Sequence, residues 1–232
     1  MKVIGFIGAY DKTDMIMYVG KILKVLRKKI LIIDSTVTQK AKYIVPSISP
    51  TLKYITEFEE IDVAIGFENI EEIKHYLGTP EDKEIEYDYI LIDVDNHIGF
   101  ANFELEKAQK NYFVTSIDVY SLKKGMEILS NLQQHINLTK IYYTKEILKE
   151  DDDYLNYLSS TYKVNWNEYK MYFPFENGDL SAIAENQRVE KIKFRKLSVA
   201  YKEGLAYLTL DIAKEFSEGN IRKAIKFIEK GA

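Results

Sequence analysis

A lysine and a threonine, Lys12 and Thr13, stand at the start of a predicted helix, after a short apolar stretch and the loop from Gly8 to Asp11. A buried strand that turns into a helix points free backbone N–H groups at whatever lies above the turn, so such a turn binds anions. Lys-Thr also ends the phosphate-binding motif G-x-x-x-x-G-K-[ST], in which the lysine contacts phosphates and the hydroxyl contacts Mg²⁺. The chemistry that these residues could perform is binding of a Mg-nucleotide.

The loop departs from this motif at position 11, where Asp11 replaces the second glycine. Glycine at this place lets the backbone wrap phosphates in a conformation that a Cβ disfavours. A carboxylate about 4 Å from a phosphate, at an effective dielectric of about 20, costs ~4 kcal/mol per unit charge. At ~1.4 kcal/mol per decade, this repulsion weakens nucleotide binding by about a thousandfold. Asp14 places one more carboxylate beside the loop. The sequence therefore predicts weak nucleotide binding or none.

Carboxylates also stand at the ends of several predicted strands. Ligands of doubly wound sheets sit above the carboxyl ends of the strands, and Mg²⁺ is held by hard oxygen ligands. The residues concerned are Asp34, Asp93, Asp95 and Asp118. Asp93 is the candidate ligand of a metal-bound water. Each of these residues also has a purely structural alternative. The aspartates could simply supply the polar residue that a strand end needs. Thr13 is equally suited to a helix cap, and Lys12 to the solvated first turn of a helix.

The elements that must position these residues follow from the apolar pattern. Strand and helix patterns alternate up to about residue 145, which predicts an α/β fold with a doubly wound, mostly parallel sheet and helices on both faces. Strands are expected at 3–7, 30–33, 62–67, 89–92, 112–117, 138–143 and 169–173. Helices are expected at 13–28, 70–77, 103–110, 121–132, 180–185, 197–216 and 220–230. The charge run 149–153 is expected to be a solvated loop.

Composition limits the other possibilities. A chain of 232 residues with 46% hydrophobic content fits one domain over residues 1–232. The absence of cysteine excludes disulfides and thiolate metal sites, and three scattered histidines argue against a histidine-built one. No apolar run approaches the ~18 residues of a membrane span, and no signal peptide is recognised, so a cytoplasmic protein is expected. The net charge of −4 gives no general attraction to nucleic acid.

The order of these pieces resembles the MinD/ParA family of P-loop ATPases, the deviant Walker A group of the SIMIBI class, over nearly the whole chain. Residues 11–14 stand where the family has G-K-T-[TS], residues 29–34 resemble its K-V-L-L-I-D, and residues 87–93 resemble its Walker B strand Y-D-Y-I-I-I-D. Residues 172–175 resemble its late strand ending in I-P. The resemblance implies a P-loop NTPase-like three-layer sandwich. It assigns nucleotide binding to Gly8, Asp11, Lys12 and Thr13, Mg²⁺ binding to Thr13 and Asp93, and catalysis to Asp34 if the site is active.

Departures from the family pattern extend beyond Asp11. The family's extra lysine near the start of the loop is missing from residues 5–10, and residues 93–96 read D-V-D-N where the second switch usually reads D-x-P-P or D-x-P-x-G. The resemblance with these departures implies a pseudo-ATPase that binds ATP or ADP with Mg²⁺ weakly or not at all. Such a protein is similar to TadZ/CpaE-type proteins, which act as positioning or assembly partners of a pilus, secretion or conjugation apparatus. A homodimer with protein partners is expected, at the membrane face through those partners.

Other functions stay open at this point. One alternative is an active, Mg-ATP-dependent, dimerising ATPase that uses Lys12, Thr13, Asp34 and Asp93. Another is a DNA-partitioning protein that contacts the DNA backbone through the basic segment 188–202, for which a solvated helix face is the default. The segment 220–230 could lie on a membrane surface, although short amphipathic helices usually pack on their own domain.

Overall fold

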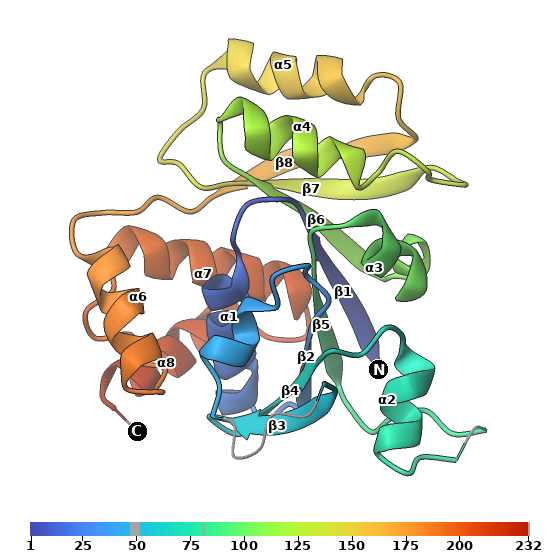
Figure 1. Ribbon diagram of the computed structural model, residues 1–232. Helices are drawn as coiled ribbons and strands as arrows, with labels where there is room; N and C mark the ends of the chain where they lie inside the picture. Colours follow the sequence, from blue (N-terminus) through green and yellow to red (C-terminus); the bar gives the residue numbers. More distant parts are fainter. Residues whose placement is uncertain (47–51, 81, 232) are drawn as a thin grey trace.

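The computed structural model describes residues 1–46, 52–80 and 82–231. Within them, eight strands form one sheet in the order β3-β4-β2-β5-β1-β6-β7-β8. The strands are β1 (Lys2–Ile7), β2 (Ile30–Asp34), β3 (Tyr54–Phe58), β4 (Ile61–Ile65), β5 (Tyr89–Val94), β6 (Lys110–Thr115), β7 (Ile136–Tyr142) and β8 (Val164–Tyr172). Only β3 runs antiparallel to its neighbour β4, and the other neighbouring strands are parallel (Figure 1).

Helices cover both faces of this sheet. They are α1 (Thr13–Val25), α2 (Ile70–Tyr76), α3 (His97–Asn102), α4 (Val119–Glu127), α5 (Lys149–Ser159), α6 (Asp179–Arg188), α7 (Val199–Ile212) and α8 (Glu218–Glu229), with short 3-10 turns η1 (Lys40–Tyr43) and η2 (Leu105–Lys107). One apolar core joins one face of the sheet to α1, α6, α7 and α8, and a second core joins the other face to α2, α3, α4 and α5. This arrangement confirms the predicted doubly wound α/β fold.

The central strands show why the apolar runs in the sequence lack alternation. Every residue of β2 and of β5 is buried. A parallel strand with helices on both faces has no solvent side, so both sets of side chains must be apolar until the strand ends. The first polar residues of β2 and β5, Asp34 and Asp93, pair in register at the carboxyl edge of the sheet. The fold thus brings these two carboxylates together.

The structure differs from the sequence prediction at three elements. The helix expected at 103–110 is replaced by α3, which begins earlier because Asn96 caps it, and by the short η2. The charge run 149–153 is no loop: it forms the first turns of α5, where acidic side chains are favoured by the helix dipole. The antiparallel strand β3 at the edge of the sheet was not predicted.

The two segments considered for DNA and membrane contact are part of the folded domain. Residues 188–202 run from the end of α6 through a non-helical connection into α7, so they present no continuous helix face. Most apolar side chains of α8 are buried among those of α1 and α7 in the first core, and its Phe227 is half exposed. Within the described ranges, no helix combines the length and apolarity that crossing a bilayer requires.

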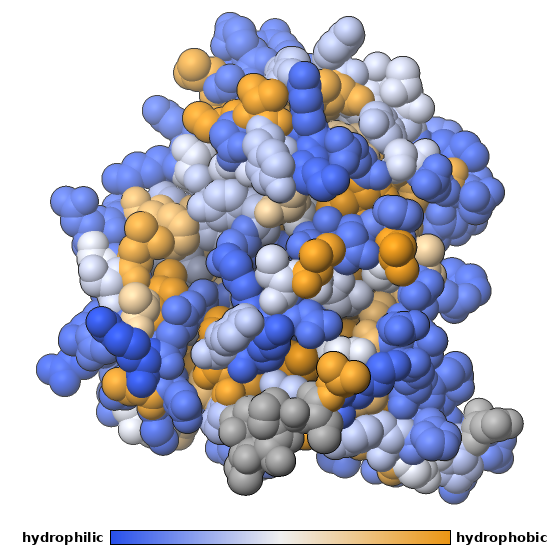
Figure 2. Space-filling view, in the orientation of Figure 1, coloured by the Kyte–Doolittle hydropathy of each residue, from blue (hydrophilic) through white to orange (hydrophobic). Residues whose placement is uncertain are grey.

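The surface alternates between charged and apolar residues. Figure 2 shows several separate apolar patches among hydrophilic residues on the face that it draws. Large apolar side chains that are more than half exposed occur in the loops and the first helical turns that follow β2, β5 and β6, at the carboxyl edge of the sheet. They are Val37, Tyr43, Ile98, Ile117, Val119 and Tyr120.

Candidate functional site

The loop between β1 and α1 is pressed against the sheet. Gly8 has a φ of 149°, and a Cβ built there would lie 2.0 Å from the carbonyl oxygen of Val114 in β6. The N–H of Gly8 donates to the carbonyl of Val94 at the end of β5 (3.0 Å). Only glycine fits this position, because any side chain would meet the backbone of the neighbouring strand.

The Lys12 side chain turns inward instead of toward solvent. Its Nζ lies 2.7 Å from Oδ1 of Asp93, and both side chains are almost completely buried. The same ammonium group donates to the carbonyl oxygen of Gly8 (2.8 Å). The cation that would contact a phosphate is therefore neutralised by a carboxylate of the protein itself.

Asp11 accepts hydrogen bonds from two donor groups at the start of α1. Its Oδ1 accepts from the backbone N–H of Thr13 (3.3 Å) and from the Thr13 hydroxyl (3.1 Å). Its Oδ2 forms an ion pair with Lys40 of η1 at 2.7 Å. Burial by itself raises the pKa of Asp11, but the bonds to Lys40 and Thr13 outweigh burial and hold that pKa below its ordinary value. Asp11 is therefore an ionised carboxylate over the first free N–H of the helix.

Asp93 is the buried centre of the site. The Thr13 hydroxyl approaches its Oδ2 (3.4 Å), so Lys12, Thr13 and Asp93 meet as the resemblance implied. Burial is the main cause that raises the pKa of Asp93 to about 6, and the nearby charge of Asp34 adds to it, whereas Lys12 acts in the opposite direction. Because the pKa of Asp93 stays raised in spite of Lys12, the lysine only partly compensates the cost of burying the Asp93 carboxylate.

The other strand-end carboxylates are engaged in local structure. Asp34 accepts from the N–H and hydroxyl of Thr36 and from the N–H of Ala41, so both of its oxygens bind the segment that follows β2. Asp118 caps α4 through the N–H and hydroxyl of Ser121. Hydrogen bonds from Ser116 and Ser121 lower the pKa of Asp118 to about 2. Asp34 adjoins the Lys12–Asp93 pair, whereas Asp118 serves its own helix.

As they lie, these residues do not fit a Mg-triphosphate. Lys12 is bound to Asp93, and the Thr13 hydroxyl and N–H are bound to Asp11. Within the described part of the chain, no cluster of three or more histidine, aspartate or glutamate side chains is arranged to hold a metal ion. Binding of nucleotide at this loop requires these internal contacts to break.

Sequence reasoning missed the partners that close the site. Lys40 is 29 positions from Asp11, and Gln187, which donates to Asp14 (2.8 Å), is 173 positions from it. Neither residue belongs to a motif. Only the tertiary fold, which brings η1 and α6 beside the loop, could have identified them.

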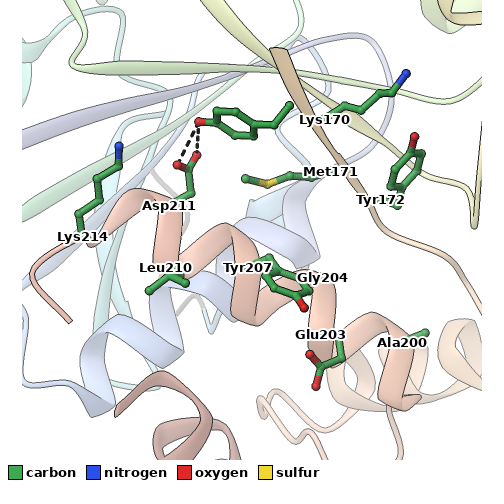
Figure 3. Close-up of a pocket in the computed structure, with 11 residues that line it drawn as sticks. Lys170, Met171, Tyr172, Ala200, Glu203, Gly204, Tyr207, Leu210, Asp211 and Lys214 are labelled. Carbon is green, nitrogen blue, oxygen red and sulfur yellow. Dashed lines mark hydrogen bonds between the residues drawn. The ribbon is translucent and has the colours of Figure 1, made fainter. Parts of the chain in front are cut away.

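A groove of about 720 Å³ lies away from this loop, between β8 and α7 (Figure 3). Its lining includes Met171, Tyr207 and Leu210. Its acidic residues have partners inside the protein, since Tyr169 donates to Asp211 (3.0 and 3.1 Å) and Arg222 pairs with Glu203. The groove therefore offers mainly tyrosyl and aliphatic surface, and it contains none of the predicted site residues.

No family model matches the chain, and no curated protein matches it either. Solved structures do match. The MinC:MinD cell division protein complex of Aquifex aeolicus gives a TM-score of 0.57 at 16% identity, over 94% of this chain and 97% of that one. A ParA family ATPase from Chlorobium tepidum TLS gives 0.55 at 12% identity, over 97% of each chain. A putative plasmid partition protein from Borrelia burgdorferi B31, bound to AMPPNP, gives 0.52 at 15% identity, over 99% of each. At such identities the likeness shows the fold, which is the α/β P-loop NTPase-like fold of these MinD and ParA neighbours.

Proposed function

We propose that this chain is a MinD/ParA-like protein with a degenerate P-loop, which binds nucleotide weakly or not at all. It acts, as one domain over residues 1–232, as a positioning or assembly partner of a larger apparatus for pilus formation, secretion or conjugation. The observation that carries this proposal is the buried ion pair between Lys12 and Asp93, 2.7 Å long, together with the capture of the Thr13 N–H by Asp11.

The energetics of that ion pair support weak nucleotide binding. To reach a phosphate, Lys12 must leave a carboxylate that is itself almost fully buried. An uncompensated buried charge costs ~3–5 kcal/mol, which at ~1.4 kcal/mol per decade lowers the nucleotide affinity by about two to three and a half orders of magnitude. Repulsion from Asp11 adds to this loss, although Lys40 offsets part of its charge.

The carboxyl edge of the sheet supports a role in protein contacts. Six large apolar side chains (Val37, Tyr43, Ile98, Ile117, Val119 and Tyr120) are more than half exposed in the loops and helix starts around the site. Exposed apolar patches framed by polar residues commonly mark protein interfaces. We infer that this edge contacts a second copy of the chain. Sedimentation velocity should give a dimer that Ile98→Asp and Tyr120→Asp each weaken, and a monomer at all concentrations would refute the inference.

Isothermal titration with Mg-ATP tests the nucleotide proposal. We expect no binding tighter than the high micromolar range. Thr13→Ala serves as a second variant, because it removes the hydroxyl without exposing a buried charge. Tight binding that Lys12→Ala and Thr13→Ala both abolish would refute the proposal.

One observation favours a second candidate, an active Mg-ATP-dependent ATPase of the MinD/ParA type. Lys12, Thr13 and Asp93 converge on one point, with Asp34 adjacent, as such an enzyme would need. Steady-state phosphate release that Lys12→Ala and Asp34→Ala eliminate would establish this function. Phosphate release that is no faster than in buffer without the protein, even with candidate partner proteins present, would exclude this function.

A further inference from the structure

A small cavity of about 270 Å³ lies between the loop and α6. This volume is below the ~300–1,000 Å³ of pockets that enclose a whole drug-sized ligand, so it suits one functional group or one side chain. Asp11 and Leu180 at its rim are exposed, which leaves a way in from solvent. The lining residues are Tyr10, Asp11, Asp14, Phe175, Leu180, Ile183, Ala184, Gln187 and Tyr201.

Aromatic rings form much of this cavity's surroundings. Phe175 stacks on Tyr201, with ring centroids 5.5 Å apart and an interplanar angle of 13°. Tyr143 packs behind them, 5.3 Å from the ring of Phe175 and 4.6 Å from that of Tyr10. The face of an aromatic ring carries partial negative charge and attracts cations within about 6 Å. The walls of the cavity therefore favour a positively charged group.

The carboxylates of the cavity also favour a positively charged group. Asp14 is partly buried, and its Oδ2 accepts a hydrogen bond from the neutral amide of Gln187 (2.8 Å). Asp11 has a cationic partner, Lys40, whereas among the described residues no lysine, arginine or histidine forms an ion pair with Asp14. Two carboxylates and one lysine leave the cavity with a net negative charge.

A third, independent feature is the hydroxyl of Tyr201. The side chain is completely buried, and its oxygen has no hydrogen-bond partner among the described residues. The Tyr143 hydroxyl is near enough to interact with it electrostatically, but the two groups are not placed as donor and acceptor of a hydrogen bond. An unpaired buried hydroxyl costs ~1–3 kcal/mol, so it indicates a place where a ligand atom completes the bonding.

We propose that this cavity binds a guanidinium or alkylammonium group, held by Asp14, by the oxygen of Tyr201 and by the aromatic faces of Tyr10 and Phe175. The group could belong to a free organic amine or to an arginine or lysine side chain of a protein partner, and the chemistry of recognition is the same for both. The inference does not depend on whether the neighbouring loop binds nucleotide.

NMR titration of the full chain with n-butylguanidinium, and with its neutral isostere n-butylurea, tests the proposal. We expect saturable shifts of the Tyr10, Asp14 and Gln187 signals with the cation and none with the urea. Asp14→Asn keeps an oxygen for Gln187 but removes the charge, and should weaken binding about tenfold, equivalent to ~1.4 kcal/mol. Tyr201→Phe should weaken it by a smaller factor. Glu60→Gln, a carboxylate change on the surface beyond the other end of α1, should leave it unchanged.

A second arm distinguishes the two sources of the cation. The peptide Gly-Arg-Gly is compared with Gly-citrulline-Gly, which lacks the charge. Binding of the arginine peptide at least as tight as that of butylguanidinium would assign the cavity to a protein side chain, and binding of the small cation alone would assign it to a free amine. Equal binding of cation and urea, affinity unaffected by Asp14→Asn, or no binding at millimolar cation would overturn the proposal. Titration with Mg-ATP is a separate measurement, so failure here leaves the nucleotide proposal untouched.

Discussion

Replacing Lys12 with methionine tests whether this lysine is a structural counter-ion or a ligand held ready for phosphate. The side chains of Lys12 and Asp93 are 2% and 3% exposed, and their charged atoms lie 2.7 Å apart. Removing one partner of such a pair leaves the other charge buried, which costs ~3–5 kcal/mol. We therefore expect Lys12→Met to lower the free energy of unfolding by about that amount at neutral pH. For a chain of this size, the melting temperature should fall by roughly 6–20 °C.

The loss should depend on pH, because Asp93 titrates. Its pKa of about 6 lies above the ordinary aspartate value of 3.8. A carboxyl whose pKa is higher in the folded state binds its proton more tightly there, so its contribution to stability falls as pH rises from about 4 to about 6. At ~1.36 kcal/mol per pKa unit, the ionised carboxyl costs about 3 kcal/mol at neutral pH. Without Lys12 the pKa rises further, so the loss in Lys12→Met should be smaller at about pH 5 than at about pH 8.

Urea unfolding, followed by circular dichroism and Trp166 fluorescence, measures these differences. The double variant Lys12→Met/Asp93→Asn removes both charges and should recover most of the stability that Lys12→Met loses. Lys24→Met is the matched control on the same helix, because its pair with Glu60 is exposed (3.4 Å) and such pairs contribute ~0.2–1 kcal/mol. A Lys12→Met protein as stable as the Lys24→Met control, or a double variant no more stable than the single one, would refute the reasoning.

Three further predictions concern the loop and its surroundings. Asp11→Gly should tighten Mg-ATP binding at least tenfold in calorimetry, since it removes a carboxylate whose repulsion is ~4 kcal/mol before Lys40 offsets it; unchanged affinity would contradict this. Gly8→Ala should cost more than 2 kcal/mol in urea unfolding, roughly twice the ~1 kcal/mol of Gly78→Ala, because Gly78 also has a positive φ but open space around it. Equal losses would show that the contact with β6 is unimportant. Asp118→Ala should lose ~1 kcal/mol with the α4 cap. In the wild type, the low pKa of Asp118 means that its stabilisation is lost as pH falls from about 4 to about 2, and a carboxyl NMR titration with a midpoint near 4 would contradict this.

The sheet could be predicted from sequence because its central strands are buried on both faces. The run 89–92 is apolar without interruption, and such a run admits few alternatives when helical patterns flank it. The helix α5 was missed because its first turns are charged and its buried face is narrow, with Leu155 and Ser159 its only fully buried residues. Edge strand β3 was missed because partly exposed residues give it no continuous apolar run.

The sequence predicted where the site residues lie, but not which contacts their side chains make. The order of loop, Lys12-Thr13 and Asp93 correctly placed these three residues together. The sequence could not indicate that Lys12 turns onto Asp93, because a phosphate-binding lysine and a structural one have the same neighbours along the chain. The contact of Asp11 with Lys40 depends on how the segment after β2 folds back, which no local pattern encodes.

A crystal structure grown with Mg²⁺ and a non-hydrolysable ATP analogue tests the central claim most directly. We predict that Lys12 Nζ stays on Asp93 and the carbonyl of Gly8, that Asp11 keeps the Thr13 N–H, and that the loop holds no analogue. Phosphate density over the loop, with Lys12 turned away from Asp93 and Asp11 displaced outward, would contradict the account.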